Sequence, residues 1–433
     1  MKLRILSLLF IFSLNATFGQ QKLSSDDAVS IALKNNYNIL VAKNSAEAAK
    51  INNSAGNAGM LPFVSLSASG NYSFNNSINQ TLSSGSESKV SDAHSSSVNS
   101  GADLSWTLFD GGKMFITKSK LNEIQALGDI QYKAQVLQTI GDVIIAYYDV
   151  VRQTQQLVSI EEAINSTQTS VNILQTSFGA GLSPKTNLLQ AEIDLNVFRE
   201  NAINQQAVII ASKRNLNQLL SRDPNTDFQV VDSIPLGYVP DKNELESKLY
   251  ANNTSVQAFQ KQAEIARLSL GETKTIQLPK LSFNAGYNFN GSKNNYSTIL
   301  QNQTAGPQIG GTLTIPIYQS GNAARQIETS RLQYQSAQFN LESTKIQINS
   351  DLQNTLTSFE NQKNLLEIEK SNMELAKENL LITMERLRLG QTTSLELHQA
   401  QQSYVDSNTR YINFEYDLKV AETKLKQLLS ILQ

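Results

Sequence analysis

The chain has 433 residues, enough for a large core or several domains. Its 36 basic and 38 acidic residues nearly balance, which does not indicate a nucleic-acid-binding surface. The absence of cysteine excludes disulfides, thiolate chemistry and an acylated N-terminal cysteine, and two histidines cannot build a histidine-rich metal site.

Residues 1–19 have the pattern of a secretory signal peptide. Basic residues precede an apolar run, residues 5–14, that is too short to span a bilayer, and Thr17 and Gly19 are small residues before the expected cleavage site. A buried N-terminal helix is the alternative. The mature chain has no run of 18 apolar residues, so we expect an exported protein whose membrane crossing, if any, is made by strands.

The mature chain begins with a predicted helix, residues 23–57, which Ser24 or Ser25 can cap. Pro62 blocks its continuation. A β-hairpin is predicted next, over residues 63–109. Each of its strands alternates apolar residues with Ser, Asn or Thr, and a long polar loop over about 76–96 is expected between them.

A single long helix is predicted over residues 113–178, after the turn Phe109-Asp110-Gly111-Gly112. It contains no proline, and at ~1.5 Å per residue it spans roughly 100 Å. A strict seven-residue repeat predicts that it supercoils with a neighbouring helix. The repeat has two rows: Val136, Val143, Val150, Leu157, Ile164, Val171 and Phe178, and Ile130, Leu137, Ile144, Val151 and Val158.

The first repeat ends with a predicted helix, residues 184–221, which follows a tight break around Gly181. Residues 222–240, with three prolines, are expected to form an irregular connection. Together these elements make residues 20–221 the first of two copies of one unit.

The second copy, residues 241–433, repeats the same order. The apolar row returns 209 positions later at Leu352, Phe359, Leu366, Met373, Leu380 and Leu387, and Gly181 corresponds to Gly390. The predicted elements of this copy are a helix (241–276), a hairpin (280–318), a long helix (322–389) and a last helix (392–432).

The four strands carry one apolar, aromatic face and one small, polar face. A soluble sheet with one buried face gives the same pattern, but aromatic residues near the strand ends and the export signal favour strands of an outer-membrane barrel. The residues expected to face lipid are Leu66, Tyr72, Trp106, Phe283, Tyr287 and Ile315.

Four strands cannot close a barrel, because an open edge would leave unpaired backbone groups in lipid. Copies of the chain must therefore share strands: two copies give eight strands and three give twelve, and the larger number begins to leave a lumen. The helices are rich in Gln, Asn, Ser, Thr and Ala, which favours a hollow tube with wet surfaces over a solid bundle. A solvent-exposed coiled-coil stalk is the alternative.

This ordered set of elements resembles the TolC-like outer-membrane efflux protein family over about residues 23–432. The features that carry the resemblance are the duplicated helix–hairpin–long helix–helix unit, the Leu61-Pro62 and Leu278-Pro279 pairs, the Leu108-Phe109-Asp110-Gly111-Gly112 turn and the two glycine breaks. The resemblance implies a membrane α+β fold: a homotrimeric 12-stranded β-barrel, four strands per protomer, continued by a long α-helical coiled-coil periplasmic tunnel.

The resemblance also implies a place and partners: the outer membrane of a Gram-negative bacterium, a periplasmic adaptor protein and, through it, an inner-membrane pump. The chain would be a passive exit duct for tripartite efflux or type I secretion. The adaptor would open it at a periplasmic tip that consists of Phe178, Gly181, Leu182, Ser183, Arg388, Leu389, Gly390 and Gln391. Simple helix termination accounts for the two glycines as well.

Members of the family often narrow the tunnel with acidic residues six and nine positions after the break glycine. Here Glu396 is the best match, whereas Gln399 and Asn187 stand where acids are often found. The resemblance therefore implies a sparse carboxylate ring at this tunnel constriction, and an ordinary solvated carboxylate is the alternative for Glu396.

No nucleophile–base constellation, phosphate-binding loop or metal motif stands out, so we expect no enzyme, no cofactor and no metal site. A surface-tethered coiled-coil structural or adhesive protein without a conducting pore is the competing function, and a periplasmic adaptor is a weaker one.

Overall fold

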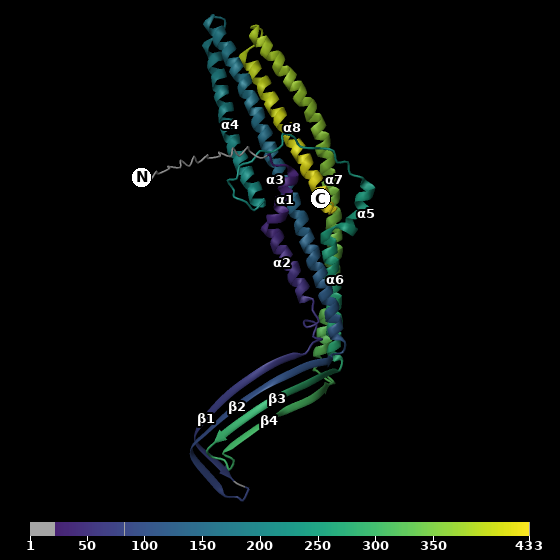
Figure 1. Ribbon diagram of the computed structural model, residues 1–433. Helices are drawn as coiled ribbons and strands as arrows, with labels where there is room; N and C mark the ends of the chain where they lie inside the picture. The colour runs from purple at the N-terminus through teal and green to yellow at the C-terminus, as the bar shows by residue number, and fades with distance from the viewer. Residues whose placement is uncertain (1–21, 82, 433) are drawn as a thin grey trace, which may run out of the picture. The chain divides into compact units, whose positions relative to one another are not determined.

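The computed structural model describes residues 22–81 and 83–432, so the predicted signal peptide lies outside the described residues. The chain divides into two compact units (Figure 1). The sheet unit comprises residues 42–133 and 254–347, and the helical unit comprises the described residues of 1–41, 134–253 and 348–433.

The sheet unit holds four strands and the helices that join them. These elements are most of α2 (Tyr37–Asn52), β1 (Phe63–Thr81), β2 (Glu87–Phe109), the start of α3 (Lys113–Gly179), α6 (Thr254–Lys274), η1 (Thr275–Gln277), β3 (Lys280–Asn294), β4 (Gln301–Thr314) and the start of α7 (Asn322–Arg388). The helical unit holds α1 (Ser25–Asn35), α4 (Lys185–Leu219), α5 (Lys242–Asn252), α8 (Ser394–Leu428) and the remainders of α3 and α7.

The four strands form one antiparallel sheet in the order β1-β2-β3-β4 (Figure 1). Its central pair joins the two repeats, because β2 of the first hairpin pairs with β3 of the second. The register shifts once, between Thr107 and Phe109. Strands β1 and β4 each have only one neighbour in this sheet, so they are its two edges.

The strands are longer than the sequence predicts. The polar segment 76–96, expected to be a loop, continues the ladder to Thr81 and from Glu87, and β3 and β4 likewise extend to Asn294 and from Gln301. The prediction failed because an alternation of apolar and polar residues shows only that one face of a strand is apolar. Backbone hydrogen bonds between strands also form along Ser- and Asn-rich segments that lack this alternation.

Strand β4 also ends earlier than predicted, at Thr314 rather than near Tyr318. Pro316 has no N–H with which to continue a ladder. Ile315, one of the six residues expected to face lipid, therefore lies just beyond the strand.

The first helix of each repeat is broken in two, which corrects the predicted single helices 23–57 and 241–276. The side chain of Asn36 accepts hydrogen bonds from the backbone N–H of Asn38 (2.9 Å) and Ile39 (3.3 Å), and so caps α2. Its Nδ2 donates to Leu219 O (2.8 Å), and Nδ2 of Asn253 donates in the same way to Leu428 O (2.9 Å). The same polar anchor thus recurs in both repeats.

Side chains join the helices of the sheet unit. Lys118 on α3 donates to Asn53 O after α2 (3.1 Å), and Lys261 on α6 pairs with Glu123 on α3 at 2.7 Å. The hydroxyls of Thr273 and Ser330 link α6 to α7 at 3.0 Å. Of these contacts, the ion pair between Lys261 and Glu123 joins the two repeats.

Tyr147 organises the main core of the helical unit. It is fully buried, its hydroxyl donates to Leu23 O (2.8 Å), and it accepts from the N–H of Val231 (3.2 Å). Burial raises the pKa of this phenol. Residues 222–240, irregular as the sequence predicts, thereby pack against α1 and α3, and Phe228, Val230 and Ile234 join the core.

The seven-residue rows supply much of the buried surface of the long helices. Val143, Val150 and Val151 are fully buried on α3, and Leu352 is fully buried on α7. Phe178 and Val158 are exceptions, because each is exposed. Among the described residues, no helix has both the length and the apolar character that crossing a membrane requires.

Candidate functional site

The sheet sorts apolar and polar side chains onto opposite faces. Residues that pair directly across strands project to the same side. Leu66 pairs with Ala102, which pairs with Tyr287, and Trp106 pairs with Phe283. Tyr72 lies on the same face, since it is separated from Leu66 by an even number of positions. Five of the six residues expected to face lipid therefore share one face.

This apolar face is exposed in the single chain. The exposed fraction is 84% for Leu66, 68% for Tyr72 and 58% for Tyr287. A continuous exposed apolar surface is typical of a contact with lipid or with another protein. Trp106 adds a polar anchor at one end, where its indole N–H donates to Met60 O (2.9 Å).

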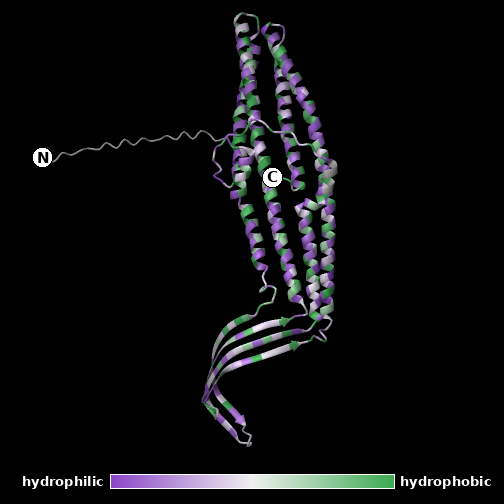
Figure 2. Cartoon of the chain, turned by 45° about the vertical axis from the view of Figure 1, so that its right-hand side comes forward, coloured by the Kyte–Doolittle hydropathy of each residue, from purple (hydrophilic) through white to green (hydrophobic). Residues whose placement is uncertain are grey.

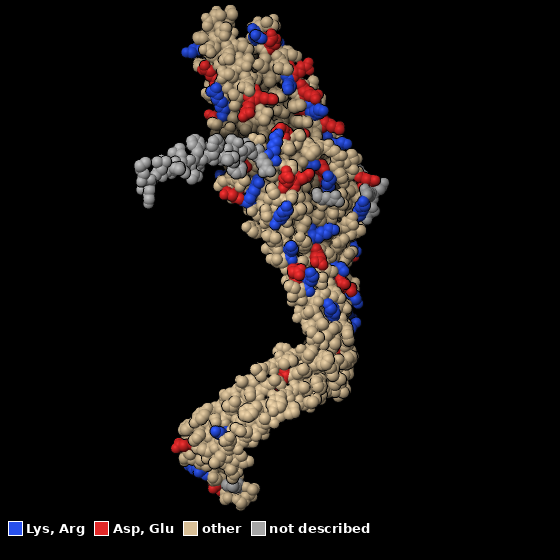
Figure 3. Space-filling model, in the orientation of Figure 1, with Lys and Arg blue, Asp and Glu red and all other residues tan. Residues whose placement is uncertain are grey.

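The opposite face is small and polar. Ser65, Ser67, Ser69 and Asn71 project from β1, and Ser, Asn, Gly and Thr occupy most of the paired positions on the other strands. Hydrophobic and hydrophilic residues alternate along the strands in Figure 2, and Figure 3 shows few charged side chains over the sheet. The side chains of this face can form hydrogen bonds with water.

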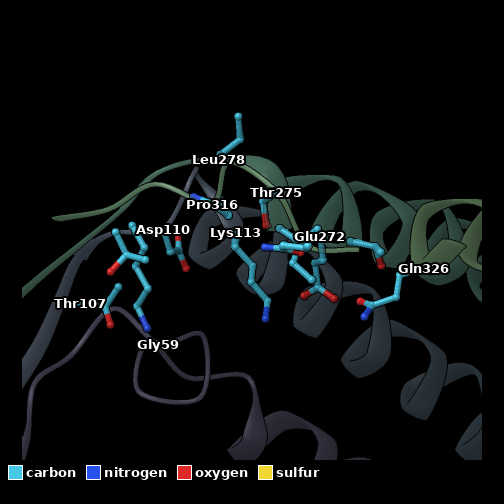
Figure 4. Close-up of a pocket in the computed structure, with 14 residues that line it drawn as sticks. Gly59, Thr107, Asp110, Lys113, Glu272, Thr275, Leu278, Pro316 and Gln326 are labelled. Atoms are coloured by element: carbon cyan, nitrogen blue, oxygen red, sulfur yellow. Dashed lines mark hydrogen bonds between the residues drawn. The ribbon is translucent and has the colours of Figure 1, made fainter. Parts of the chain in front are cut away.

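The turn between β2 and α3 is built around Asp110. Its carboxylate accepts the backbone N–H of Met114 at 3.1 and 3.2 Å, so it caps the first turn of α3. Beside it lies a cavity of about 540 Å³, which Figure 4 shows. Lys113, Lys280 and Glu272 bring charges of both signs to its lining. Glu272 accepts from Thr117 (2.6 Å) and pairs with Lys120, so its carboxylate is engaged within the unit.

The two glycine breaks have one geometry. At the end of α3, Gly181 has φ +71° and donates to Phe178 O (2.9 Å), while Leu182 donates to Ser177 O (2.8 Å). The end of α7 repeats this pattern, with Gly390 at φ +69°. There Gly390 donates to Leu387 O (3.0 Å) and Gln391 donates to Arg386 O (2.8 Å). Both are Schellman motifs, in which glycine avoids the strain of a left-handed residue.

Around the breaks, several predicted tip residues are exposed. The exposed fraction is 83% for Leu182, 62% for Leu389 and 41% for Phe178. Below them, Leu174, Leu188, Leu387 and Leu397 are buried in a core that α3, α4, α7 and α8 share. The helix ends therefore carry exposed apolar side chains on a packed base.

Glu396 is held beside the second break. Its backbone N–H donates to Thr393 Oγ1 (3.3 Å), its carboxylate accepts from Thr392, and Arg386 lies 3.8 Å away. Gln399 is exposed, and Asn187 donates to Ser183 Oγ (3.2 Å). All three candidate constriction residues lie within the first turns after the breaks.

Comparison with known protein families identifies the chain. The model of the outer membrane efflux protein family matches residues 28–222 and 245–430, which is one match for each repeat. This chain belongs to the outer membrane efflux protein family. It is therefore an outer-membrane efflux protein, as the sequence predicts. A comparison with curated proteins gives no match.

Solved outer-membrane channels have the same fold. The CmeC channel of Campylobacter jejuni matches with a TM-score of 0.78 and 18% identity over 94% of this chain and 85% of that one. VceC of Vibrio cholerae matches with a TM-score of 0.76 and 16% identity, over 94% and 96%. The open state of the Neisseria gonorrhoeae MtrE channel matches with a TM-score of 0.74 and 16% identity, over 94% and 88%.

One polar link in this efflux protein was missed by sequence reasoning. Nδ1 of His398 on α8 lies 3.0 Å from Oδ2 of Asp194 on α4, and Gln190 donates to the other carboxylate oxygen (2.9 Å). The pair borders a cavity of about 430 Å³. Asp194 and His398 belong to different repeats and no spacing connects them, so the sequence offers no signal for the contact.

Proposed function

We propose that three copies of this efflux protein pool their strands into one closed wall around a water-filled conduit. The observation that carries the proposal is the four-stranded sheet with an exposed apolar face, a polar face and two open edges. In lipid, the unpaired backbone groups of an edge each cost several kcal/mol. Pairing β1 of one copy with β4 of the next removes every edge.

In this assembly the apolar face of the sheet contacts lipid and the polar face lines the lumen. The residues that then contact outer-membrane lipid are Leu66, Tyr72, Trp106, Phe283 and Tyr287. Ile315 lies at the edge of this surface, just beyond the end of β4. Twelve strands, four from each of three copies, are enough to leave a lumen that side chains do not fill. Eight strands from two copies would leave a filled interior, which a conduit cannot have.

The tip of the helical unit is the proposed adaptor contact. Exposed apolar side chains beside a helix end, such as Leu182 and Leu389, are available to a partner that packs helices against them. The proposed contact set comprises Phe178, Gly181, Leu182, Ser183, Arg388, Leu389, Gly390 and Gln391. A periplasmic adaptor bound there would join the duct to an inner-membrane pump, which supplies the energy.

Opening is proposed to occur at the same end. The helices near Gly181 and Gly390 would shift from a closed to an open packing when the adaptor binds. Glu396 of each copy would then form a sparse acidic ring, with Asn187 and Gln399 as neutral neighbours. Because Arg386 lies 3.8 Å from Glu396, the ring is partly neutralised within each copy.

Purified, detergent-extracted protein reconstituted in planar bilayers tests the proposal. We expect a stable oligomer with the mass of three chains that gives discrete single-channel currents. The competing function, a surface-tethered coiled-coil protein without a pore, finds no support in the comparisons. A stable trimer that never conducts, with or without an adaptor, would nevertheless favour it.

A further inference from the structure

The polar face of the sheet is nearly free of ionisable residues, and Asp103 is the exception away from the strand ends. The register places the other ionisable residues of this face near the strand ends: Glu87 and Lys89 lie beside the β1–β2 turn, and Lys280 begins β3. Between them, the described residues of this face are Ser, Asn, Thr, Gln, Gly and Ala, apart from Asp103 and from Phe63 at the start of β1.

Asp103 lies in a row whose other members are neutral. Across the sheet the row runs from Ser65 through Asp103 and Gly286 to Gln308. The neighbouring residues of this face on β2 are Gly101 and Ser105. No basic side chain occupies these positions, so the row contains no cation that could neutralise the carboxylate.

The neighbouring strand leaves space for the carboxylate. A Cβ built on Gly286 would lie 2.7 Å from Oδ1 of Asp103 and 3.5 Å from Nε2 of Gln308. Both side chains therefore lie over the glycine, where any larger residue would displace them. Asp103, which is half-buried, thus lies against the sheet on the polar face.

We propose that Asp103 makes the strand-lined part of the conduit selective for small cations. The inference rests on the proposed function, because it requires the polar face to line a lumen. Identical copies place one Asp103 each at the same height, which gives a ring of carboxylates. Rings of acidic side chains concentrate cations and repel anions in this way.

The size of the effect follows from Coulomb's law. A charge about 10 Å from the ion path in a water-like dielectric changes the local ion population about two-fold, and each copy contributes one such charge. Because salt screens charges over about 10 Å at 0.1 M and about 3 Å at 1 M, the selectivity should weaken as the salt concentration rises.

The test is the reversal potential of single channels of the full chain under a potassium chloride gradient. Asp103→Asn keeps the shape and removes the charge, and we expect the ratio of cation to anion permeability to fall at least about two-fold. Asp103→Lys should favour anions. Glu396→Gln, which removes the acid of the proposed tip constriction, is the comparison that shows at which end of the conduit the selectivity lies.

The outcomes separate this inference from the proposed function. Absence of any current from the wild-type trimer would overturn both. A conducting wild type whose permeability ratio is unchanged in Asp103→Asn, or changes equally at low and high salt, would overturn the inference alone. A ratio that responds only to Glu396→Gln would place the selectivity at the tip and would overturn it as well.

A second variant covers the case in which Asp103→Asn fails to assemble. The chain has no cysteine, so Asp103→Cys can be modified after assembly at this single site. A sulfonate-bearing thiosulfonate reagent should restore cation preference, and an ammonium-bearing one should favour anions. Identical effects of the two reagents would contradict a role for charge.

Discussion

Asp194 and His398 join the two repeats through a side-chain contact of 3.0 Å between Oδ2 and Nδ1. Asp194 is largely buried, with 11% of its side chain exposed, whereas 41% of the His398 side chain is exposed. The contact links α4 to α8 in the part of the helical unit that leads to the glycine breaks.

Removal of either partner should loosen α4 and α8 locally. In a double-mutant cycle of Asp194→Asn and His398→Asn, we expect a coupling of about 0.5–1 kcal/mol, modest because one partner is partly exposed to water. Hydrogen exchange of the surrounding amides measures it. Gln402→Ala is the control, because Gln402 borders the same cavity but donates within its own helix to Asp406 (2.8 Å). Additive effects of Asp194→Asn and His398→Asn would show that the two residues are not energetically coupled.

The second prediction concerns the requirement for glycine at the two helix breaks. Gly181→Ala and Gly390→Ala should each destabilise the end of their helix by about 1 kcal/mol, because both residues have positive φ. No atom lies within 4 Å of a Cβ built at either position, so the cost is one of backbone conformation and not of space. Amide hydrogen exchange in the last turns of α3 and α7 measures it.

Gly179 provides the control for these substitutions. It is the last residue of α3, has no neighbour within 4 Å of a built Cβ, and does not have positive φ. Gly179→Ala should therefore be neutral or slightly stabilising. Equal destabilisation at positions 179 and 181 would mean that the left-handed conformation does not set the requirement for glycine.

The two faces of the sheet predict opposite responses to charge. Leu66→Arg, on the apolar face, should cost roughly 2–4 kcal/mol if the residue lies near the middle of the bilayer. Ser67→Arg, one position along and on the polar face, should be far milder. The yield of assembled oligomer extracted from membranes measures both effects. Similar losses for the two variants would be inconsistent with the assigned faces.

Glu415 on α8 should make the folding stability of the protein depend on pH. Burial raises the pKa of its carboxyl, partly offset by a hydrogen bond from Gln155. The folded state therefore holds this proton more tightly than the unfolded state, so stability falls as pH rises from the ordinary carboxyl pKa through the raised one.

Substitution of Glu415 by Gln removes that dependence. Glu415→Gln should raise the melting temperature at pH 8 relative to wild type. At pH 4 it should leave the melting temperature nearly unchanged, because the folded wild type and the variant both carry a neutral side chain at position 415. Glu378→Gln, on an exposed part of α7, is the control and should change neither. A larger gain at pH 4 than at pH 8 would reverse the sign and refute the assignment.

The periodic parts of the fold could be predicted from the sequence. Heptad residues such as Val143 and Leu352 are buried because a repeat of seven keeps one seam against a neighbour. The break at Gly390 could also be located, since only a residue that tolerates positive φ ends a helix in this manner. Both signals are local and repeat in the two halves.

Contacts between residues far apart in the chain could not be predicted. Asn36 breaks the first helix because its amide reaches Leu219, and His398 meets Asp194 only in the folded chain. The length of β2 was underestimated because Ser-rich segments pair through the backbone, which leaves no hydrophobic pattern. The place of Asp103 over Gly286 likewise required the register, because the sequence does not show which residues of β2 and β3 pair.

Cysteine accessibility along β1 shows directly whether one face of the sheet contacts lipid and the other contacts water inside a shared wall. Single cysteines are introduced at positions 64–71 of the cysteine-free chain, and the protein is assembled in outer membranes. The membranes are then treated with a water-soluble thiol reagent that does not enter lipid. We expect the odd positions, Ser65 to Asn71, to react and the even positions, Val64 to Gly70, not to react. Equal reaction at odd and even positions, or reaction at the even positions alone, would contradict it.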